Sequence, residues 1–260
     1  MRHVEQLNRF RPDYFTCTYG AGGSTRDKTL DIVTAVKERL DIPVASHLTC
    51  VGSSVEQLRS YLAEASGRGI DYIVALRGDP PQGETEFQPA SDGFRHANEL
   101  VEMIRAEYSN FGIAVAGYPE KHLEASSYDV DIENLKRKVD AGGQIVITQL
   151  FYHNEDYFRF RDACDAAGIQ VPLIPGILPI TNLAQIQRIS SLCGAKLPES
   201  LVQRLGERDD DLWQFQAGVD FAVGQVQELV DNQIPGVHFY VLNKSAATSD
   251  VLEALNLPAR

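Results

Sequence analysis

Residues 44–50 read VASHLTC and residues 53–65 read SSVEQLRSYLAEA, after which residues 72–77 read YIVALR. The first and third stretches are short apolar runs, which is typical of buried β-strands. In the stretch between them, apolar side chains recur every three or four positions, and Ser53 with Glu56 predicts a capping box at the start of a helix. A strand, a helix and a second strand in this order predict a βα unit of a parallel sheet.

The same alternation continues along the rest of the chain. Two further helices are predicted by apolar stripes over residues 132–139 and 183–189, which stop at Gly142 and Gly194 respectively. The complete set of predicted strands is 14–19, 44–50, 72–77, 114–118, 145–151, 173–178 and 237–242.

The repeated units predict an α/β protein with a (βα)8 TIM barrel. A length of 260 residues suits one such barrel, which usually needs about 250, so we expect a single catalytic domain over residues 1–260. Seven strands would leave two unpaired edges, and Val4, Leu7 and Phe10 have helical spacing directly before the first predicted strand. We therefore expect the first β-strand and part of the first helix to be missing.

Composition excludes several classes of function. The chain has 24 Lys and Arg against 36 Asp and Glu, a net charge of −12 that is spread along the sequence, so nucleic acid and anionic membrane are not expected partners. Cys17, Cys50, Cys164 and Cys193 lack metal-ligand spacing, which favours reduced thiols over disulfides or a metal site. Neither a membrane span nor a signal peptide is visible, so we expect a cytoplasmic protein.

Polar residues follow the predicted strands, at the end of a parallel barrel where active sites are found. Asp79 comes after an apolar strand and before two prolines, and it could be a turn residue or a carboxylate beside a cofactor ring. Gln149 ends another strand, where its amide could hydrogen-bond a heterocycle or only a neighbouring loop. His47 alone is more typical of a packed core histidine.

Arg137 and Lys138 lie on a predicted amphipathic helix. Such a charged run is usually a solvated face, although two cations could also neutralise a cofactor pyrophosphate. No Gly-x-Gly-x-x-Gly or Walker sequence follows a strand, so a Rossmann dinucleotide domain is not expected.

Several segments together resemble the flavin-dependent methylenetetrahydrofolate reductases. They occur in order over nearly the whole chain: TCTYGA at 16–21, HLTC at 47–50, VALRGD at 74–79, YPE at 118–120, NLKRKVDAG at 134–142, ITQ at 147–149, PGILP at 175–179 and HFY at 238–240. Any one segment is weak evidence, but the ordered set is specific.

The resemblance implies a (βα)8 barrel that binds FAD non-covalently. The flavin would take a hydride from NADH or NADPH and pass it to 5,10-methylenetetrahydrofolate, forming 5-methyltetrahydrofolate for one-carbon metabolism and methionine biosynthesis. By motif position, the residues expected around FAD are Thr18, His47, Arg77, Gly78, Asp79, Ala90, Tyr118, His122, Ala125, Asp131, Asn134, Arg137 and Lys138.

The resemblance also implies a folate site. Asp79 and Gln149 would be catalytic residues that also contact the folate, and the further substrate contacts would be Gln185, Tyr240 and Lys244. Many relatives carry Arg at the Lys244 position, and Lys keeps the charge but loses the bidentate fork. An aromatic residue that stacks on ligand in some relatives would fall at Ile189. Relatives are commonly homo-oligomers, so we expect the same here.

The family's first strand, a Phe-Glu-Phe-Phe-Pro-Pro-like segment, carries the Glu that protonates the folate, and no such segment is in the sequence. General acid catalysis contributes roughly 10²- to 10⁴-fold, so we expect slow folate reduction, with flavin binding and NADH oxidation retained. The alternative is a flavin- or folate-binding paralogue or truncated form with little or no reductase activity. A different barrel, such as a pterin-binding transferase or a proline dehydrogenase, would have to produce the ordered motifs by chance.

Overall fold

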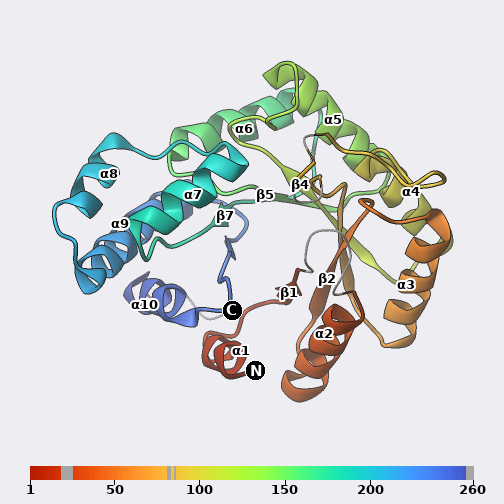
Figure 1. Ribbon diagram of the computed structural model, residues 1–260, viewed down its shortest axis with the longest axis horizontal. Coiled ribbons are helices and arrows are strands. Elements are labelled where there is room, and N and C mark those ends of the chain that lie inside the picture. The colour runs from red at the N-terminus through yellow and green to blue at the C-terminus, as the bar shows by residue number, and fades with distance from the viewer. Residues whose placement is uncertain (19–25, 81–82, 85, 256–260) are drawn as a thin grey trace. The chain divides into compact units, whose positions relative to one another are not determined.

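The computed structural model describes residues 1–18, 26–80, 83–84 and 86–255. Helices and strands alternate along most of these residues (Figure 1). The strands are β1 (Phe15–Cys17), β2 (Val44–Thr49), β3 (Tyr72–Leu76), β4 (Gly112–Gly117), β5 (Ile145–Thr148), β6 (Leu173–Ile174), β7 (Gly176–Ile177) and β8 (His238–Phe239). The helices are α1 (Arg2–Asn8), α2 (Arg26–Leu40), α3 (Val55–Gly67), α4 (Ala97–Glu107), α5 (Tyr128–Asp140), α6 (Asn154–Ala166), α7 (Leu183–Cys193), α8 (Glu199–Gly206), α9 (Asp211–Asp231) and α10 (Ser245–Leu255).

The strands form a sheet with the order β1-β2-β3-β4-β5-β6 and a separate pair, β7-β8. Pairing is parallel between β1, β2, β3 and β4, and also between β7 and β8. Each of the seven predicted runs contains strand, although Tyr19 at the end of the first run lies outside the described residues. The predicted sixth strand is split into β6 and β7 at Pro175, because proline has no N–H to give to a ladder.

The start of α3 differs from the prediction by one residue. Its N-cap is Ser54, whose hydroxyl accepts a hydrogen bond from the Gln57 N–H at 3.1 Å, while the Gln57 side chain accepts from the Ser54 N–H at 3.0 Å. The predicted Ser53–Glu56 box is therefore wrong. Ser53 is fully buried and its hydroxyl donates to the carbonyl of Val51 at 3.1 Å, so it serves the preceding turn instead of the helix.

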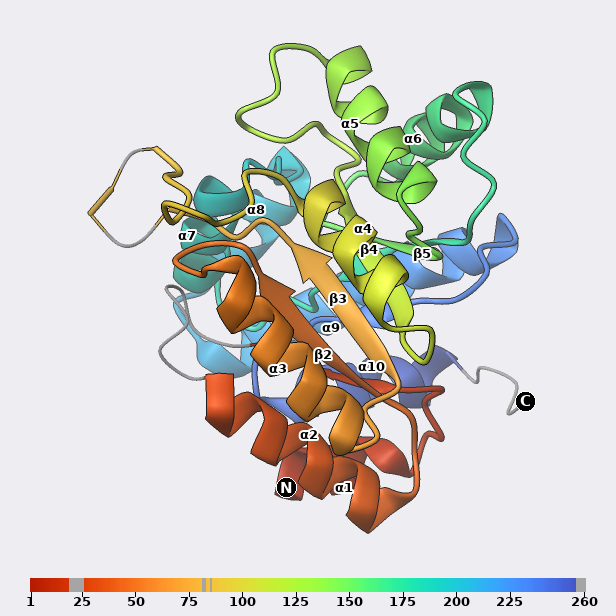
Figure 2. The same cartoon turned by 90° about the vertical axis from the view of Figure 1, so that its right-hand side faces the viewer.

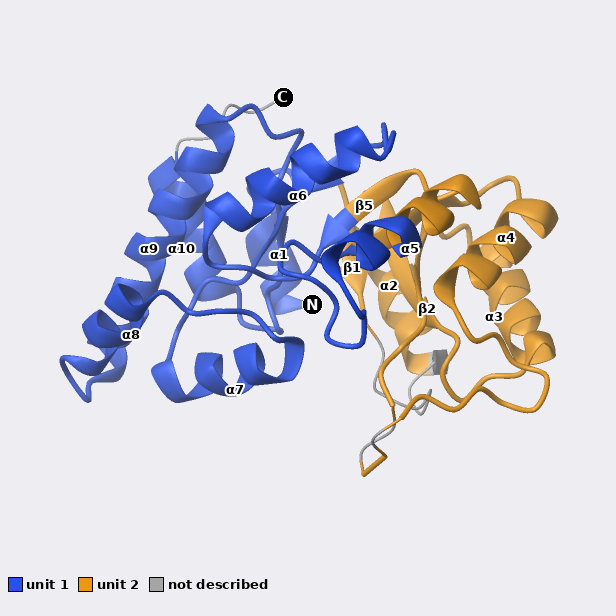
Figure 3. Ribbon diagram, turned by 90° about the horizontal axis from the view of Figure 1, so that it is seen from above, with its two compact units in different colours: residues 1–11, 117–134, 147–260 blue, residues 12–116, 135–146 orange. Residues whose placement is uncertain are grey.

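The described residues divide into two compact units, coloured separately in Figure 3. Unit 2 comprises residues 12–116 and 135–146. Within it, α2 and α3 run along β2 and β3 (Figure 2), and the side chains of Val44, Leu48 and Ile73 are completely buried. Parallel register places Cys17 beside Ser46 and His47 beside Val74.

Unit 1 comprises residues 1–11, 117–134 and 147–260. One apolar cluster joins Phe151, Tyr157 and the inner face of α9, and a second joins Leu150, Ile180 and the inner faces of α7 and α8. The predicted stop of α7 is confirmed, because Gly194 caps the helix with φ 77°, a left-handed conformation that suits glycine.

The four cysteines are free thiols, of which Cys50 and Cys164 are buried. Burial raises the pKa of each of these two thiols to about 12, so both are neutral at physiological pH. Among the residues that the structure describes, no helix combines the length and the apolar character needed to cross a bilayer.

Candidate functional site

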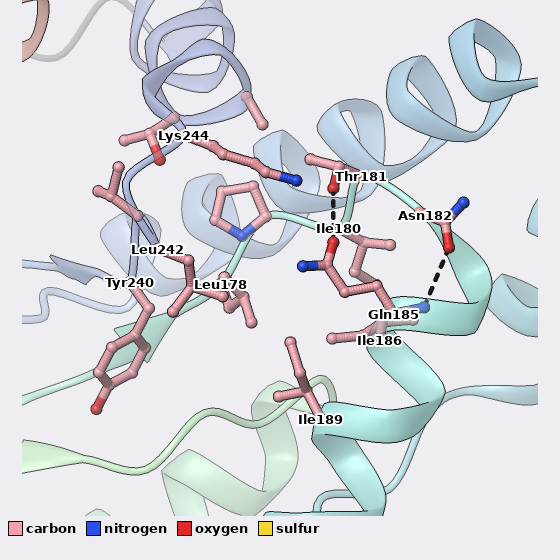
Figure 4. A pocket seen from close by; sticks show the side chains of 14 residues that line it. Leu178, Ile180, Thr181, Asn182, Gln185, Ile186, Ile189, Tyr240, Leu242 and Lys244 are labelled. Carbon is pink, nitrogen blue, oxygen red and sulfur yellow. Dashed lines mark hydrogen bonds between the residues drawn. The ribbon is translucent and has the colours of Figure 1, made fainter. Parts of the chain in front are cut away.

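A pocket in unit 1 opens between the segment after β7, the first turns of α7 and the segment that joins β8 to α10 (Figure 4). Its lining includes three of the predicted folate contacts, Gln185, Tyr240 and Lys244, together with Ile189. The Gln185 and Lys244 side chains extend into the space between α7 and the start of α10 (Figure 4). Its other lining residues are Leu178, Pro179, Ile180, Thr181, Asn182, Ile186, Val241, Leu242, Ala247 and Thr248.

Gln185 is fixed by the two residues that precede α7. Asn182 is the N-cap, and its Oδ1 accepts a hydrogen bond from the Gln185 N–H at 3.1 Å. Thr181 Oγ1 donates to Gln185 Oε1 at 3.2 Å. Since the amide oxygen is directed at Thr181, the amide Nε2 is presented on the opposite side, as Figure 4 shows. Gln185 can therefore act as a hydrogen-bond donor to a polar ligand.

Tyr240 is held at one edge of the pocket. Its hydroxyl donates to the Thr148 carbonyl at 2.7 Å, and its ring lies edge-on to His238 with centroids 5.0 Å apart. A Cβ on Gly176 would come within 2.6 Å of the Tyr240 ring and 2.2 Å of the Thr148 carbonyl. Only glycine at this position lets the ring lie so close to β7.

The turn before Lys244 is conformationally unusual. Leu242 and Asn243 both have left-handed backbones, with φ 49° and 59°, a conformation that is rare for leucine. Leu242 is also 54% exposed although it lines the pocket. Strained, exposed apolar residues cluster at ligand sites. The sequence predicted a strand through Leu242, whereas β8 ends at Phe239; the turn was not predicted, since only Asn243 is of a type that favours it.

Gln149 directly follows β5 but does not line the pocket. Its N–H donates to the Gly117 carbonyl at 2.8 Å, and its side-chain Oε1 accepts from the Leu150 N–H at 2.9 Å. Its neighbour Thr148 is the residue whose carbonyl holds Tyr240. The structure thus links Gln149 to the pocket through its two neighbours, since Leu150 packs with the pocket-lining Leu178 and Ile180.

A second group of predicted residues follows β4 in unit 1. The rings of Tyr118 and His122 meet edge to face with centroids 4.7 Å apart. The His122 N–H donates to the buried carboxylate of Asp131 at 2.8 Å, and the Ala125 N–H donates to the His122 carbonyl at 3.1 Å. Asn134 lies exposed on α5. Asp131 therefore orders the loop that carries the other members of the group.

Glu120 belongs to the same loop and was not predicted as a site residue. Its carboxylate accepts a hydrogen bond from the Lys196 N–H, with O–N distances of 3.0 and 3.2 Å. Burial raises the pKa of Glu120. The contact joins the loop after β4 to the segment after α7. In the sequence, the YPE segment at 118–120 was the feature that could have pointed to Glu120 as a site residue.

A third group lies at the strand ends of unit 2. Thr18 follows β1 and is exposed, His47 lies within β2 and is half-buried, and Asp79 is exposed beyond β3. The Arg77 guanidinium stacks 4.8 Å from the centroid of the Phe87 ring, and its Nε donates to the Gly78 carbonyl at 3.3 Å.

Gly78 and Ala90 complete this group. Gly78 has φ 87°, and a Cβ there would lie 2.6 Å from Val51 Cγ1, so both backbone conformation and space require glycine. Ala90 is half-buried, and its carbonyl accepts from the Gly93 N–H at 2.9 Å.

The two basic residues of α5 are directed differently. Lys138 Nζ donates to the Ala116 carbonyl near the end of β4 at 2.6 Å. Arg137 instead lines a surface groove formed with α4, beside Glu102 and Arg105. The structure therefore places Lys138, but not Arg137, toward a strand end.

Comparisons with known proteins agree with the ordered motifs. The family model described as methylenetetrahydrofolate reductase matches residues 1–256. The chain is 36% identical over 255 residues to 5,10-methylenetetrahydrofolate reductase of Escherichia coli K12, and the match covers 98% of this chain and 84% of that enzyme. It is 37% identical over 257 residues to the enzyme of the same name from Pectobacterium carotovorum, covering 98% of this chain and 83% of that enzyme. Methylenetetrahydrofolate reductase (NADH) 1 of Arabidopsis thaliana is 36% identical over 265 residues, and the match covers 45% of the length of the plant protein.

A solved structure supports the fold. It is an uncharacterized protein from Clostridium thermocellum that binds two copies of 5-methyl-5,6,7,8-tetrahydrofolic acid, with a TM-score of 0.59 over 98% of both chains and 14% identity. The predicted α/β fold of the TIM-barrel type is thereby confirmed. Because the family model matches almost the entire sequence, the chain belongs to the methylenetetrahydrofolate reductase family, a family of oxidoreductases.

Proposed function

We propose that this chain is an FAD-dependent methylenetetrahydrofolate reductase that uses NADH or NADPH to reduce 5,10-methylenetetrahydrofolate to 5-methyltetrahydrofolate. The observation that carries the proposal is the gathering of Gln185, Tyr240 and Lys244 around one pocket in a chain that the family model matches over residues 1–256. These residues come from two helix starts and one strand end, and no local pattern requires them to meet.

The donor set of the pocket suits a reduced folate. Gln185 offers an amide donor to a polar heterocycle, and apolar Ile189 and Leu242 offer contact surface to an aromatic ring. Lys244 is exposed at the edge, where an ammonium group can pair with the glutamate carboxylates of a folate while keeping contact with water.

The residues proposed for FAD also have fitting chemistry. Lys138 and Arg77 provide cationic groups for a pyrophosphate, while Tyr118 and His122 provide ring edges and hydrogen-bonding atoms. Bound FAD would supply the hydride relay between nicotinamide and folate. Asp79, exposed after β3, would place a carboxylate where it raises the electron density of the flavin and orients the folate.

Gln149 would hold the folate heterocycle after turning its amide away from the Leu150 N–H. The flavin would also be bound or its site shaped by the remaining proposed residues, which are Thr18, His47, Gly78, Ala90, Ala125, Asp131, Asn134 and Arg137. We further propose that the protein works in the cytoplasm as a homo-oligomer.

The test has three stages in one sample. The purified chain is expected to show the visible spectrum of bound flavin, lose it on anaerobic addition of NADH, and regain it on addition of methylenetetrahydrofolate with formation of 5-methyltetrahydrofolate. Bleaching without recovery would support the alternative of a flavin-binding paralogue with little reductase activity. A colourless protein to which FAD does not bind would contradict the proposal.

The Lys244→Met variant tests the folate site separately. It is expected to raise the KM for folate while the rate of flavin reduction by NADH is retained. Lys196→Met is a matched control, because Lys196 is also an exposed lysine of unit 1 but does not line the pocket.

A further inference from the structure

Helix α1 meets the start of α10, although more than 230 residues separate them in the sequence (Figure 1). The Ser245 hydroxyl donates to Gln6 Oε1 at 2.8 Å and lies 2.8 Å from His3 Nδ1. The Ser245 N–H points to the same His3 nitrogen at 3.4 Å. Ser245 is completely buried, so its hydroxyl depends on these two side chains for its hydrogen bonds.

Ser245 is the residue directly after Lys244. Between β8 and α10, the chain must pass through the left-handed Leu242 and Asn243, and the Lys244 N–H closes the turn on the Val241 carbonyl at 2.9 Å. A non-glycine turn of this kind persists only when its surroundings fix it. One end is fixed by β8, and the other end is fixed by the contact of Ser245 with α1.

We propose that His3 and Gln6 are positioning residues for the folate pocket, acting through Ser245 on the turn that carries Leu242 and Lys244. The inference rests on the proposed function, because it takes Lys244 as the partner of the folate carboxylates. Helix α1 contributes no residue to the pocket lining, so its effect on folate binding is indirect.

The same pair of helices provides an internal control. Arg9, the C-cap of α1, forms an ion pair with Glu253 of α10, eight residues beyond Ser245. At 1.5 Å of rise per residue, that contact lies roughly 12 Å along α10 from the turn. Arg9→Ala therefore weakens the attachment of α1 to α10 without touching the hydrogen bonds of Ser245.

The experiment compares two substitutions of one residue. Gln6→Met removes the acceptor at nearly constant size, whereas Gln6→Glu keeps an acceptor oxygen. Loss of one hydrogen bond is expected to raise the KM and the dissociation constant for folate about three- to tenfold, and His3→Ala is expected to act in the same direction. Gln6→Glu and Arg9→Ala are expected to bind folate as the wild type does. Thermal unfolding of each variant separates a local effect from loss of the fold.

A double-mutant cycle with Lys244→Met tests the route of the effect. If Gln6 acts through the turn, Gln6→Met has little further effect once Lys244 is gone. Three outcomes would overturn the inference. The KM for folate of Gln6→Met could equal that of the wild type, or Arg9→Ala could raise the KM as much as Gln6→Met does. Gln6→Met could also raise the KM as much in the Lys244→Met background as in the wild type. If Lys244→Met itself leaves folate binding unchanged, the proposed role of Lys244 fails, and the positioning role fails with it for that separate reason.

Discussion

Gln185 is held at two points by its own chain, since Asn182 fixes its backbone and Thr181 fixes the oxygen of its side-chain amide. An amide can be turned by 180° at little cost unless a neighbour distinguishes oxygen from nitrogen. In the structure the Thr181 hydroxyl donates to the amide oxygen, which leaves the amide nitrogen of Gln185 facing the pocket. A donor that is already oriented loses less conformational entropy when a ligand binds.

Replacing the Thr181 hydroxyl should weaken folate binding. Thr181→Val keeps the shape of the side chain and removes the donor, so Gln185 can turn freely, and we expect the KM for folate to rise about three- to tenfold. Thr181→Ser retains the hydroxyl and should stay close to wild type. Steady-state kinetics at saturating NADH measure the difference. Equal KM values for the Val and Ser variants would show that the hydroxyl does not orient Gln185.

Lys244 offers a substitution that should improve binding. Lys244→Arg keeps the positive charge and adds a planar fork that can pair with a carboxylate through two parallel hydrogen bonds. Because the position is exposed, solvent screens the gain, and we expect the dissociation constant for folate to fall by roughly two- to fivefold. Titration calorimetry with folates of one and several glutamates measures it. Weaker binding by the Arg variant than by Lys244→Met would contradict a carboxylate contact.

At the scale of elements, the difference at the start of α3 can be tested directly. Two consecutive serines precede the helix, and each has an acid or amide three residues later, so the sequence alone satisfies two capping boxes. The difference in burial of the two serines decides which capping box forms. Ser53 is needed in the buried turn after β2, which leaves Ser54 to cap the helix.

Ser54→Ala should lower the free energy of unfolding by about 1 kcal/mol, because the N-terminal N–H of α3 loses its acceptor. Glu56→Ala should change it by less than about 0.5 kcal/mol, since Glu56 is exposed and takes no part in the capping box. Denaturant unfolding of the two variants provides the measurement. The opposite ranking would restore the box predicted from sequence.

For the whole molecule, local patterns were sufficient to predict the strands and much of the helical structure. Apolar runs and capping residues are short-range signals, and they located each strand run. The break at Pro175 was visible in the sequence but its consequence was not, because a proline can also lie at an edge. The placement of Gln185 and Lys244 at one pocket was implied only by family resemblance. The contact of Gln6 with Ser245 was not predicted at all. Residues so far apart in sequence leave no periodicity from which their contact could be inferred.

The stability of the whole molecule should fall in mild acid because of His238. This imidazole is buried on β8, and burial lowers its pKa to about 4 from an ordinary value of 6.5. Below pH 6.5 the imidazole becomes protonated in the unfolded chain, whereas in the folded protein it stays neutral down to about pH 4. The contribution of His238 to the free energy of unfolding is therefore fully present above pH 6.5 and is lost as the pH falls toward 4. At 1.36 kcal/mol per pKa unit, the loss from this residue reaches about 3 kcal/mol at pH 4.

His238→Gln removes the titrating group while keeping a polar side chain, so it isolates this contribution from that of the carboxylates. We expect the variant to be less stable than wild type at pH 7.5 because the ring packing with Tyr240 is lost. The difference should shrink as the pH is lowered from 6.5 toward 4, since only the wild type loses stability through His238. Denaturant unfolding at several pH values gives both curves. Parallel curves would mean that His238 is protonated as readily in the folded protein as in the unfolded chain, and they would contradict the effect expected from its burial beside Gly176 and Tyr240.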